Sequence, residues 1–160
     1  NLLLNVPPDR TGQINAADSA ALIGFRKLRE EAFARDLLKN AAIYPEEAAT
    51  KKITTLTDNN IQTYWASAKK ENAALIIRLP LKKTINTISL EEMISFGQRI
   101  GSFSIESFDG TAYQTIFTGT TVGRKKIASF APIETDQIRI VFQKSKAAPV
   151  LRNLGAYLVN

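Results

Sequence analysis

Hydrophobic positions in the first forty residues repeat with a helical period. Ala21, Phe25 and Leu28 follow one another at spacings of four and three residues, which places them on one face of an α-helix. Asn15 is a suitable N-cap because its side-chain oxygen can accept a backbone N–H of the first turn. The pattern predicts one long helix over residues 16–39.

From about residue 41 onward a period of two replaces the helical period. Ile138, Ile140 and Phe142 alternate with other side chains, as residues on one face of a β-strand do. Asp109-Gly110 separates two strand-like runs and predicts a β-hairpin. Short strands with turn residues between them, and no intervening helix, predict a mainly β fold. We expect an antiparallel β-sandwich, or jelly roll, of about eight strands.

Composition narrows the possible chemistry. The 160 residues contain neither cysteine nor histidine, which excludes disulfides, Ser-His-Asp and Cys-His catalysis, and zinc held by histidine. No apolar run approaches the ~18 residues of a membrane span. The chain begins inside an apolar run and without Met, as expected of a piece cut from a longer protein.

The net charge of +6 raises the question of nucleic-acid binding. The basic residues come as scattered groups near turns, which favours a solvated rim over a nucleic-acid footprint. The groups are Lys51-Lys52, Lys69-Lys70, Lys82-Lys83 and Arg124-Lys125-Lys126.

Adjacent acidic residues occur at Glu30-Glu31, Glu46-Glu47 and Glu91-Glu92. Neighbours in sequence point to different faces of a helix or strand, so such pairs do not form a catalytic dyad. We expect these carboxylates to lie on a solvated surface and assign no catalytic residue.

Four short motifs resemble the discoidin-like, or factor V/VIII C-type, domain, which includes carbohydrate-binding module family 32. Each motif is weak alone, but all four occur in the family's order. They are Thr-Asp-Asn-Asn-Ile-Gln-Thr-Tyr-Trp-Ala at 57–66, Phe-Gly-Gln-Arg-Ile with Phe-Ser-Ile-Glu in 96–106, Gly-Arg-Lys-Lys-Ile at 123–127, and the segment 149–157.

The first forty residues resemble the end of the catalytic barrel of glycoside hydrolase family 29, the α-L-fucosidases. The matching residues are Asn-Leu-Leu-Leu-Asn-Val-Pro-Pro-Asp-Arg-x-Gly at 1–12 and Asp-Leu-Leu-Lys-Asn-Ala at 36–41. The resemblance implies the C-terminal part of an α-L-fucosidase. Residues 1–40 would be the barrel tail and connecting helix, and residues 41–160 the discoidin-like sandwich.

This resemblance implies a fragment that is not itself an enzyme. A (β/α)₈ barrel needs about 250 residues, and in the family the two catalytic carboxylates come from earlier barrel segments. It further implies a secreted or periplasmic parent, although the fragment itself does not give a localisation.

The turn with Asp58, Asn60 and Thr63 resembles the family's calcium turn, whose oxygen atoms suit Ca²⁺. Family members often add an acidic residue from the last strand, where this chain has Asn153. The alternative is an Asx-turn in which Asp58 binds backbone amides. Weak calcium binding at most is expected, and no other cofactor.

Carbohydrate-binding candidates are aromatic and cationic residues near predicted loops. Phe96 precedes Gly97 and could stack on a sugar, while Arg99 could donate to hydroxyls or pair with Asp58 or Glu92. Trp65 is expected mainly in the core. Tyr44 and Arg124 are weaker candidates.

Two interpretations of function remain open. One is an accessory domain that binds a fucosylated or galactose-containing glycan, or positions the parent's catalytic barrel. The other is a basic discoidin-like adhesion module that binds anionic glycan, lipid or protein.

Overall fold

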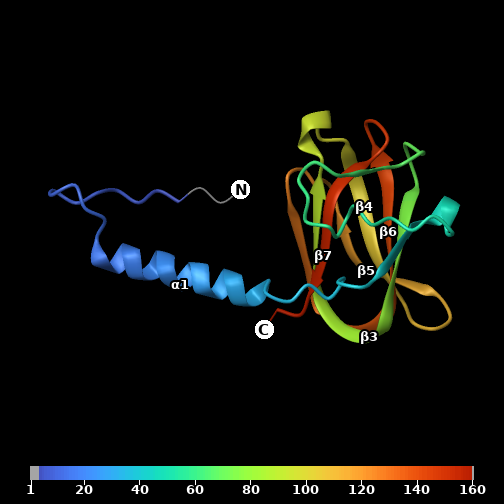
Figure 1. The fold of residues 1–160 in the computed structure, drawn as a ribbon, viewed down its shortest axis with the longest axis horizontal. Helices are drawn as coiled ribbons and strands as arrows, with labels where there is room; N and C mark the ends of the chain where they lie inside the picture. The colour runs from blue at the N-terminus through green and yellow to red at the C-terminus, as the bar shows by residue number, and fades with distance from the viewer. Residues whose placement is uncertain (1–3, 160) are drawn as a thin grey trace. The chain divides into compact units, whose positions relative to one another are not determined.

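A computed structural model describes residues 4–159. The chain divides into two compact units, the first ending at Arg35 and the second running from Asp36 to Val159 (Figure 1). The first unit contains the helix α1 (Ala16–Ala32) and the second contains all the strands.

Helix α1 begins where the sequence predicts. The Asn15 Oδ1 atom accepts the backbone N–H of Ala17 at 2.8 Å, and Asp18 lies in the first turn, where the helix dipole favours a carboxylate. No residue of α1 is buried, and Leu28 on its apolar stripe is 68% exposed.

The prediction that the helix reaches residue 39 is wrong, because α1 ends at Ala32. The residues beyond Arg35 belong to the sandwich instead. Asp36 Oδ1 accepts the backbone N–H groups of Leu38 at 2.9 Å and Ala156 at 3.1 Å. The Leu38 side chain is buried in the core, so burial and strand-edge hydrogen bonds outweigh the local helical pattern.

Seven strands form the second unit, and within residues 4–159 all their pairings are antiparallel, which confirms the predicted fold class. Two short 3₁₀ helices, η1 (Glu46–Ala48) and η2 (Ile94–Phe96), lie between strands. The strands are β1 (Ala42–Pro45), β2 (Trp65–Ala66), β3 (Ala73–Glu92), β4 (Ile100–Phe108), β5 (Tyr113–Gly119), β6 (Lys126–Ser145) and β7 (Val150–Tyr157).

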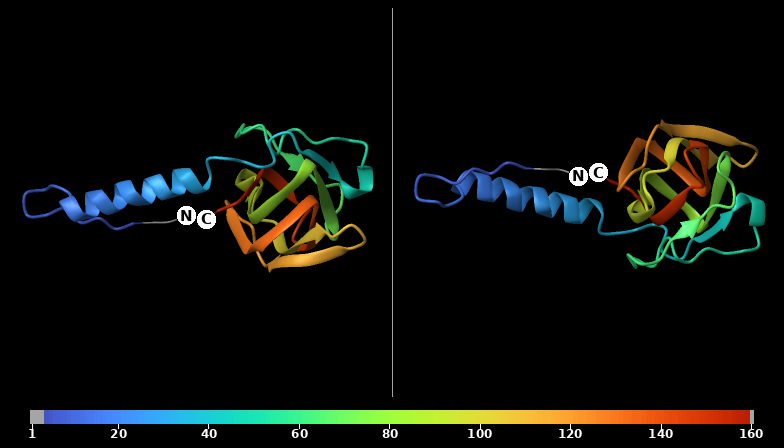
Figure 2. Two further views of the ribbon diagram at one scale, coloured as in Figure 1. Left: turned by 90° about the horizontal axis from the view of Figure 1, so that it is seen from below. Right: turned by 90° about the horizontal axis from the view of Figure 1, so that it is seen from above.

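Strands β3 and β6 are each twenty residues long and take part in both layers of the sandwich (Figures 1 and 2). The first half of β3 pairs with β1 and with the second half of β6, which continues to β4 and β5. The second half of β3 pairs with β7 and with the first half of β6. The register of β3 shifts between Arg78 and Lys83, around Pro80, which has no N–H to donate.

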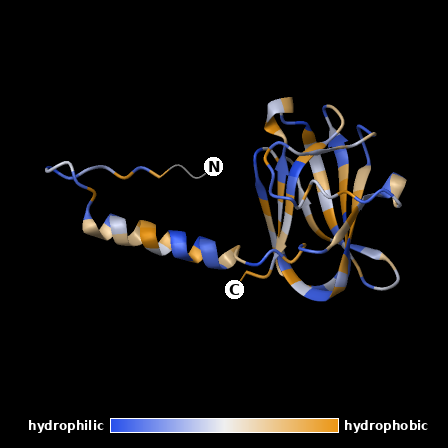
Figure 3. Ribbon diagram, in the orientation of Figure 1, coloured by the Kyte–Doolittle hydropathy of each residue, from blue (hydrophilic) through white to orange (hydrophobic). Residues whose placement is uncertain are grey.

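Alternation along the strands builds the core between the layers. Ile138, Ile140 and Phe142 are all fully buried, as their period of two predicts. Orange and blue alternate along the strands in Figure 3 for the same reason. The hairpin prediction is also confirmed: Asp109-Gly110 joins β4 to β5, and Gly110 has a φ of 103°.

Among residues 4–159, no helix is both long and apolar enough to cross a membrane.

Candidate functional site

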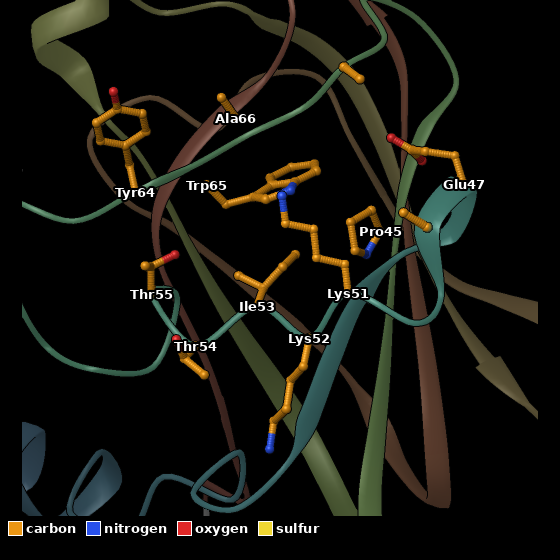
Figure 4. Close-up of a pocket in the computed structure, with 12 residues that line it drawn as sticks. Pro45, Glu47, Lys51, Lys52, Ile53, Thr54, Thr55, Tyr64, Trp65 and Ala66 are labelled. Atoms are coloured by element: carbon orange, nitrogen blue, oxygen red, sulfur yellow. The ribbon is translucent and has the colours of Figure 1, made fainter.

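A cleft of about 440 Å³ opens between the segment that follows β1 and the start of β2 (Figure 4). We call it the aromatic cleft because Tyr64 and Trp65 line one side. Its other lining residues are Pro45, Glu47, Ala48, Lys51, Lys52, Ile53, Thr54, Thr55, Ala66 and Ala68.

Trp65 is mainly a core residue, as expected. Its ring centre lies 6.4 Å from that of the buried Phe142, and its backbone pairs with Leu151 on β7. Only 8% of the residue is exposed, and it lines the cleft with this small remaining surface. The indole therefore forms a floor of the cleft that packs against the core.

Polar groups face this floor from the segment 47–55. In Figure 4 the Lys51 side chain points toward the Trp65 ring, whereas Lys52 points away from it. Glu47 and Thr55 lie on the same cleft. An ammonium group, a carboxylate and hydroxyls beside an aromatic surface can together bind a ligand that has both C–H faces and hydroxyl groups.

Long-range ion pairs hold the wall that carries Glu47. Its neighbour Glu46 binds Arg139 Nη1 at 3.1 Å, and Arg139 Nε binds Glu106 Oε2 at 2.6 Å. Arg139 lies on β6 and Glu106 on β4. The 3₁₀ turn η1 is therefore tied to the middle of the sheet.

Two exposed aromatic residues meet beside the aromatic cleft. The rings of Tyr64 and Phe96 are 5.1 Å apart in an edge-to-face arrangement, and they are 43% and 46% exposed. Phe96 is thus exposed beside Gly97, as the sequence predicts. The sequence did not predict Tyr64 as a binding residue, although it stands next to Trp65 in the motif at 57–66.

Arg99 donates hydrogen bonds from its guanidinium to backbone carbonyl groups. Its Nε donates to Phe96 O at 3.2 Å and its Nη1 donates to Ala148 O at 3.0 Å, while its guanidinium lies 5.8 Å from the Phe96 ring centre. The guanidinium pairs with neither of the acidic residues considered from the sequence. It stabilises two loops at the end of the sandwich that carries Phe96.

Glu92 is buried, so the expectation of a solvated surface is wrong for it. Its Oε1 accepts the backbone N–H groups of Arg99 at 2.7 Å and Ile100 at 2.9 Å. Its Oε2 accepts that of Gly123 at 2.6 Å. Three charge-assisted hydrogen bonds stabilise the buried carboxylate and clamp two chain segments together.

The expectation of a solvated surface is also wrong for Glu91, because this residue is buried. It pairs with Lys125 and Arg152. The two neighbouring glutamates bind different partners, Glu91 two cationic side chains and Glu92 three backbone N–H groups, and we assign no catalytic pair to them.

Tyr44 and Arg124 do not line the aromatic cleft. Tyr44 lies on β1 with the Arg78 guanidinium 5.9 Å from its ring centre. Arg124 is exposed in the turn before β6. These two candidates stay predictions; neither lines the cleft, although Tyr44 directly precedes the lining residue Pro45.

The turn that resembles the family's calcium turn brings its three residues together. The Thr63 hydroxyl lies 3.0 and 2.8 Å from the two Asp58 carboxylate oxygens and 3.0 Å from Asn60 O. Asp58 also accepts the Asn60 N–H, which is the alternative Asx-turn. The Asn153 Nδ2 atom lies 3.5 Å from Asn59 Oδ1.

This donor set fits calcium poorly. Within residues 4–159, no three His, Cys, Asp or Glu side chains are grouped as metal ligands. Asp58 is the one carboxylate in the turn 57–63, whereas Ca²⁺ takes 6–8 oxygen ligands, and the Asp58 oxygens already accept hydrogen bonds from Asn60 and Thr63.

These features define a class of protein. Residues 41–153 match the family model of the F5/8 type C domain, and the chain belongs to that family. The chain is therefore a discoidin-type sandwich domain and not a catalytic barrel.

Relatives place this domain in longer proteins. The chain is 27% identical to Alpha-L-fucosidase 1 of Arabidopsis thaliana over 98% of its own length and 33% of that protein. It is 31% identical to the crystal structure of SpGH29, with a TM-score of 0.86, and covers 99% of its own length and 35% of that chain. The chain spans about a third of the length of these relatives, and the resemblance to the C-terminal part of family 29 fucosidases is confirmed.

The family 32 carbohydrate-binding module of NanJ from C. perfringens, solved with galactose, shares the fold. Its TM-score is 0.65 at 17% identity, over 76% of this chain and 96% of the module.

Proposed function

We propose that the chain is the accessory part of an α-L-fucosidase and that its sandwich binds carbohydrate in the aromatic cleft. The observation that carries the proposal is the juxtaposition of Tyr64 and Trp65 with Glu47, Lys51 and Thr55 around one opening. Sugar recognition commonly combines an aromatic surface for C–H groups with a few placed hydrogen-bonding groups. The galactose complex of the NanJ module supports the ligand class.

The expected affinity is weak. A shallow, solvent-exposed cleft with few polar contacts must offset the loss of ligand and side-chain freedom, so a dissociation constant of about 0.1–1 mM is expected. Such a site works by raising the local concentration of substrate near a catalytic domain in the same polypeptide.

The test is an NMR titration of this chain with fucose, galactose and a fucosylated oligosaccharide. Tyr64→Ala and Lys51→Ala should each weaken binding by about fivefold or more, since each removes one side of the site. Leu81→Ala is the matched control, because Leu81 is 74% exposed in the bend of β3 and does not line the cleft. Unchanged affinity in both cleft variants would contradict the proposed site, and an absence of binding by every sugar would contradict carbohydrate binding.

The sequence alone favours a sugar site at Phe96 and Arg99. Phe96→Ala and Arg99→Lys distinguish that site from the aromatic cleft. Phe96 touches Tyr64 without lining the cleft, so its removal should have a smaller effect than Tyr64→Ala. The opposite ranking would move the site to η2.

Docking on the catalytic barrel of the same enzyme is the accessory role that helix α1 supports. Phe25 and Leu28 lie on its predicted apolar stripe and are both exposed. In the complete fucosidase, Leu28→Ser should lower the melting temperature, whereas in this chain alone it should not. Equal effects in both contexts would contradict the docking role.

A second candidate function is adhesion to anionic lipid. Besides Tyr64 and Phe96, the apolar side chains of Ile61 and Ile94 are exposed in the same two segments. Co-sedimentation with vesicles of phosphatidylserine and phosphatidylcholine tests it, with Phe96→Ser and Ile94→Ser as variants. Binding that both variants abolish would favour lipid, and an absence of binding would leave carbohydrate as the ligand class.

A further inference from the structure

A second cleft, of about 270 Å³, lies apart from the aromatic cleft and shares no residue with it. We call it the polar cleft. Glu91 from β3 and Asn153 from β7 are directly paired across the strands, and Asn59 approaches from the turn 57–63. Lys125, Arg152 and Tyr157 also line it.

Charge in the polar cleft is unbalanced. Glu91 Oε1 binds Lys125 Nζ at 3.1 Å, and Glu91 Oε2 binds Arg152 Nη2. Two cations thus share one buried carboxylate, which leaves one net positive charge on the lining. The Glu91 side chain is 9% exposed and the Lys125 side chain is 45% exposed, so the excess charge faces the solvent side of the cleft.

Both cations keep hydrogen-bond donors beyond those that Glu91 uses. A guanidinium has five N–H groups and an ammonium has three. Arg152 gives one Nη2 contact and Lys125 gives one contact to Glu91. The remaining N–H groups suit a carboxylate, for which the guanidinium fork is well matched in geometry.

Besides Glu91, the carboxylate of Asp36 acts on a lining residue, because its negative charge raises the pKa of Tyr157. It does not line the cleft, and its Oδ1 is bound to the backbone N–H groups of Leu38 and Ala156. The charge that an entering ligand meets at the cleft lining is therefore set by Glu91, Lys125 and Arg152.

The lining also includes Asn60 and Ile61 beside the amide side chains of Asn59 and Asn153. Asn153 Nδ2 lies 3.5 Å from Asn59 Oδ1, at the limit of a hydrogen bond. Each amide offers both donors and an acceptor, which is the complement that vicinal hydroxyls need. One net positive charge matches a monoanion better than a doubly charged phosphate.

We propose that the polar cleft binds a carboxylate-bearing sugar unit, with the carboxylate at Lys125 and Arg152 and the ring hydroxyls at Asn59 and Asn153. This site is separate from the aromatic cleft and does not depend on the proposed function of that cleft. It would give the domain a preference for glycans that carry uronic acid.

The test is an NMR titration with D-glucuronate, using D-glucose as the neutral counterpart, in EDTA and at low ionic strength. Glucuronate should shift the Arg152 Nε–H and Asn153 side-chain signals and bind with a dissociation constant of about 1–10 mM. Lys125→Gln removes one of the two cations and should weaken glucuronate binding by about fivefold or more. In this variant Glu91 keeps Arg152 as a partner. Lys126→Gln is the matched control, one residue further on and outside the lining.

Asn153→Asp is a second variant that keeps both ion pairs and adds a negative charge to the cleft, so it should abolish binding. Equal binding of glucose and glucuronate, equal effects of Lys125→Gln and Lys126→Gln, or no saturation at about 50 mM would each overturn the proposal. The two clefts give different NMR signals, Trp65 for the aromatic cleft and Arg152 for the polar cleft. If the Tyr64 and Lys51 variants bind neutral sugars as the unmodified chain does, that result contradicts only the proposed site in the aromatic cleft.

Discussion

The guanidinium carbon of Arg139 lies 4.1 Å from the ring centre of Tyr113. The same guanidinium binds Glu106 on β4 and Glu46 on η1. One β6 side chain therefore joins β5, β4 and the 3₁₀ turn that carries Glu47. The position of a cleft wall depends on a residue that does not touch the cleft.

Replacing Arg139 should affect both stability and sugar binding. Arg139→Gln removes two ion pairs and a cation–π contact, so we expect a loss of about 1–3 kcal/mol in the free energy of unfolding. The freed η1 turn should also weaken binding at the aromatic cleft. Urea denaturation and sugar titration measure the two effects, and Lys82→Gln, at an exposed position outside the cleft lining, should change neither. Full sugar affinity in a folded Arg139→Gln variant would show that η1 needs no anchor.

Glu92→Gln should be among the more destabilising single substitutions. An amide has one acceptor oxygen, and its NH₂ group would face a backbone N–H donor where Glu92 now accepts three. Loss of charge-assisted bonds and one unsatisfied buried donor should cost about 2–4 kcal/mol. Denaturant unfolding checks this. A cost as small as that of Glu47→Gln, on the exposed cleft wall, would contradict the clamp.

Two glycines should respond in opposite directions to alanine. A Cβ on Gly155 would lie 2.4 Å from Tyr157 Oη and 3.0 Å from Ser89 Oγ, whereas a Cβ on Gly24 meets nothing within 4 Å. Gly155→Ala should therefore destabilise by about 1–3 kcal/mol. Gly24→Ala, inside α1, should raise helix stability by up to about 1 kcal/mol. Thermal unfolding followed by circular dichroism measures both.

Stability at alkaline pH should depend on Tyr157. Burial, with the nearby charge of Asp36, raises the pKa of Tyr157 above its ordinary value of 10.0. Because the folded-state pKa is raised, the protonated Tyr157 hydroxyl contributes to the free energy of unfolding. This contribution is fully present below pH 10 and is lost as the pH rises through the folded-state pKa. Tyr157→Phe should therefore flatten the decline in stability above pH 10, and Tyr44→Phe is the comparison. An unchanged decline in Tyr157→Phe would place its hydroxyl in water.

Calcium should bind weakly if at all. Asp58 is the carboxylate of the turn 57–63, and it already accepts hydrogen bonds from the Thr63 hydroxyl and the Asn60 N–H. Adding 1 mM CaCl₂ to an EDTA-treated sample should raise the melting temperature by less than about 2 °C. A dissociation constant below about 1 µM by calorimetry would contradict this account of the turn.

Local patterns in the sequence predict the elements that depend on local forces. The Asn15 cap, the Asp109-Gly110 hairpin and the inward positions of β6 follow from neighbouring residues alone. Ala74–Leu79 and Ile85–Leu90 are separated in the sequence by residues 80–84, yet both lie in the single strand β3. Sequence periodicity cannot distinguish a bend in β3 from a break in it, because Pro80 is compatible with both.

Long-range contacts set the parts that the sequence does not reveal. Asp36, which the sequence places in the helix, instead accepts the backbone N–H of Ala156, 120 residues away. Arg99 looked like a ligand donor because an arginine in a loop gives no sign of the carbonyls that reach it. The aromatic cleft includes residues 47–55, where no periodic pattern marks Lys51 or Thr55 as neighbours of Trp65.

Strands β3 and β6 each run through both layers of the sandwich. Neither layer can lose its hydrogen bonds without disrupting a strand of the other, so sub-global opening of a single layer is disfavoured. Amide hydrogen exchange in the centres of both strands should therefore proceed only through global unfolding, with one common free energy. The short β2, paired over two residues, should exchange through local opening and free the rim of the aromatic cleft to adjust while the rest of the sandwich stays closed.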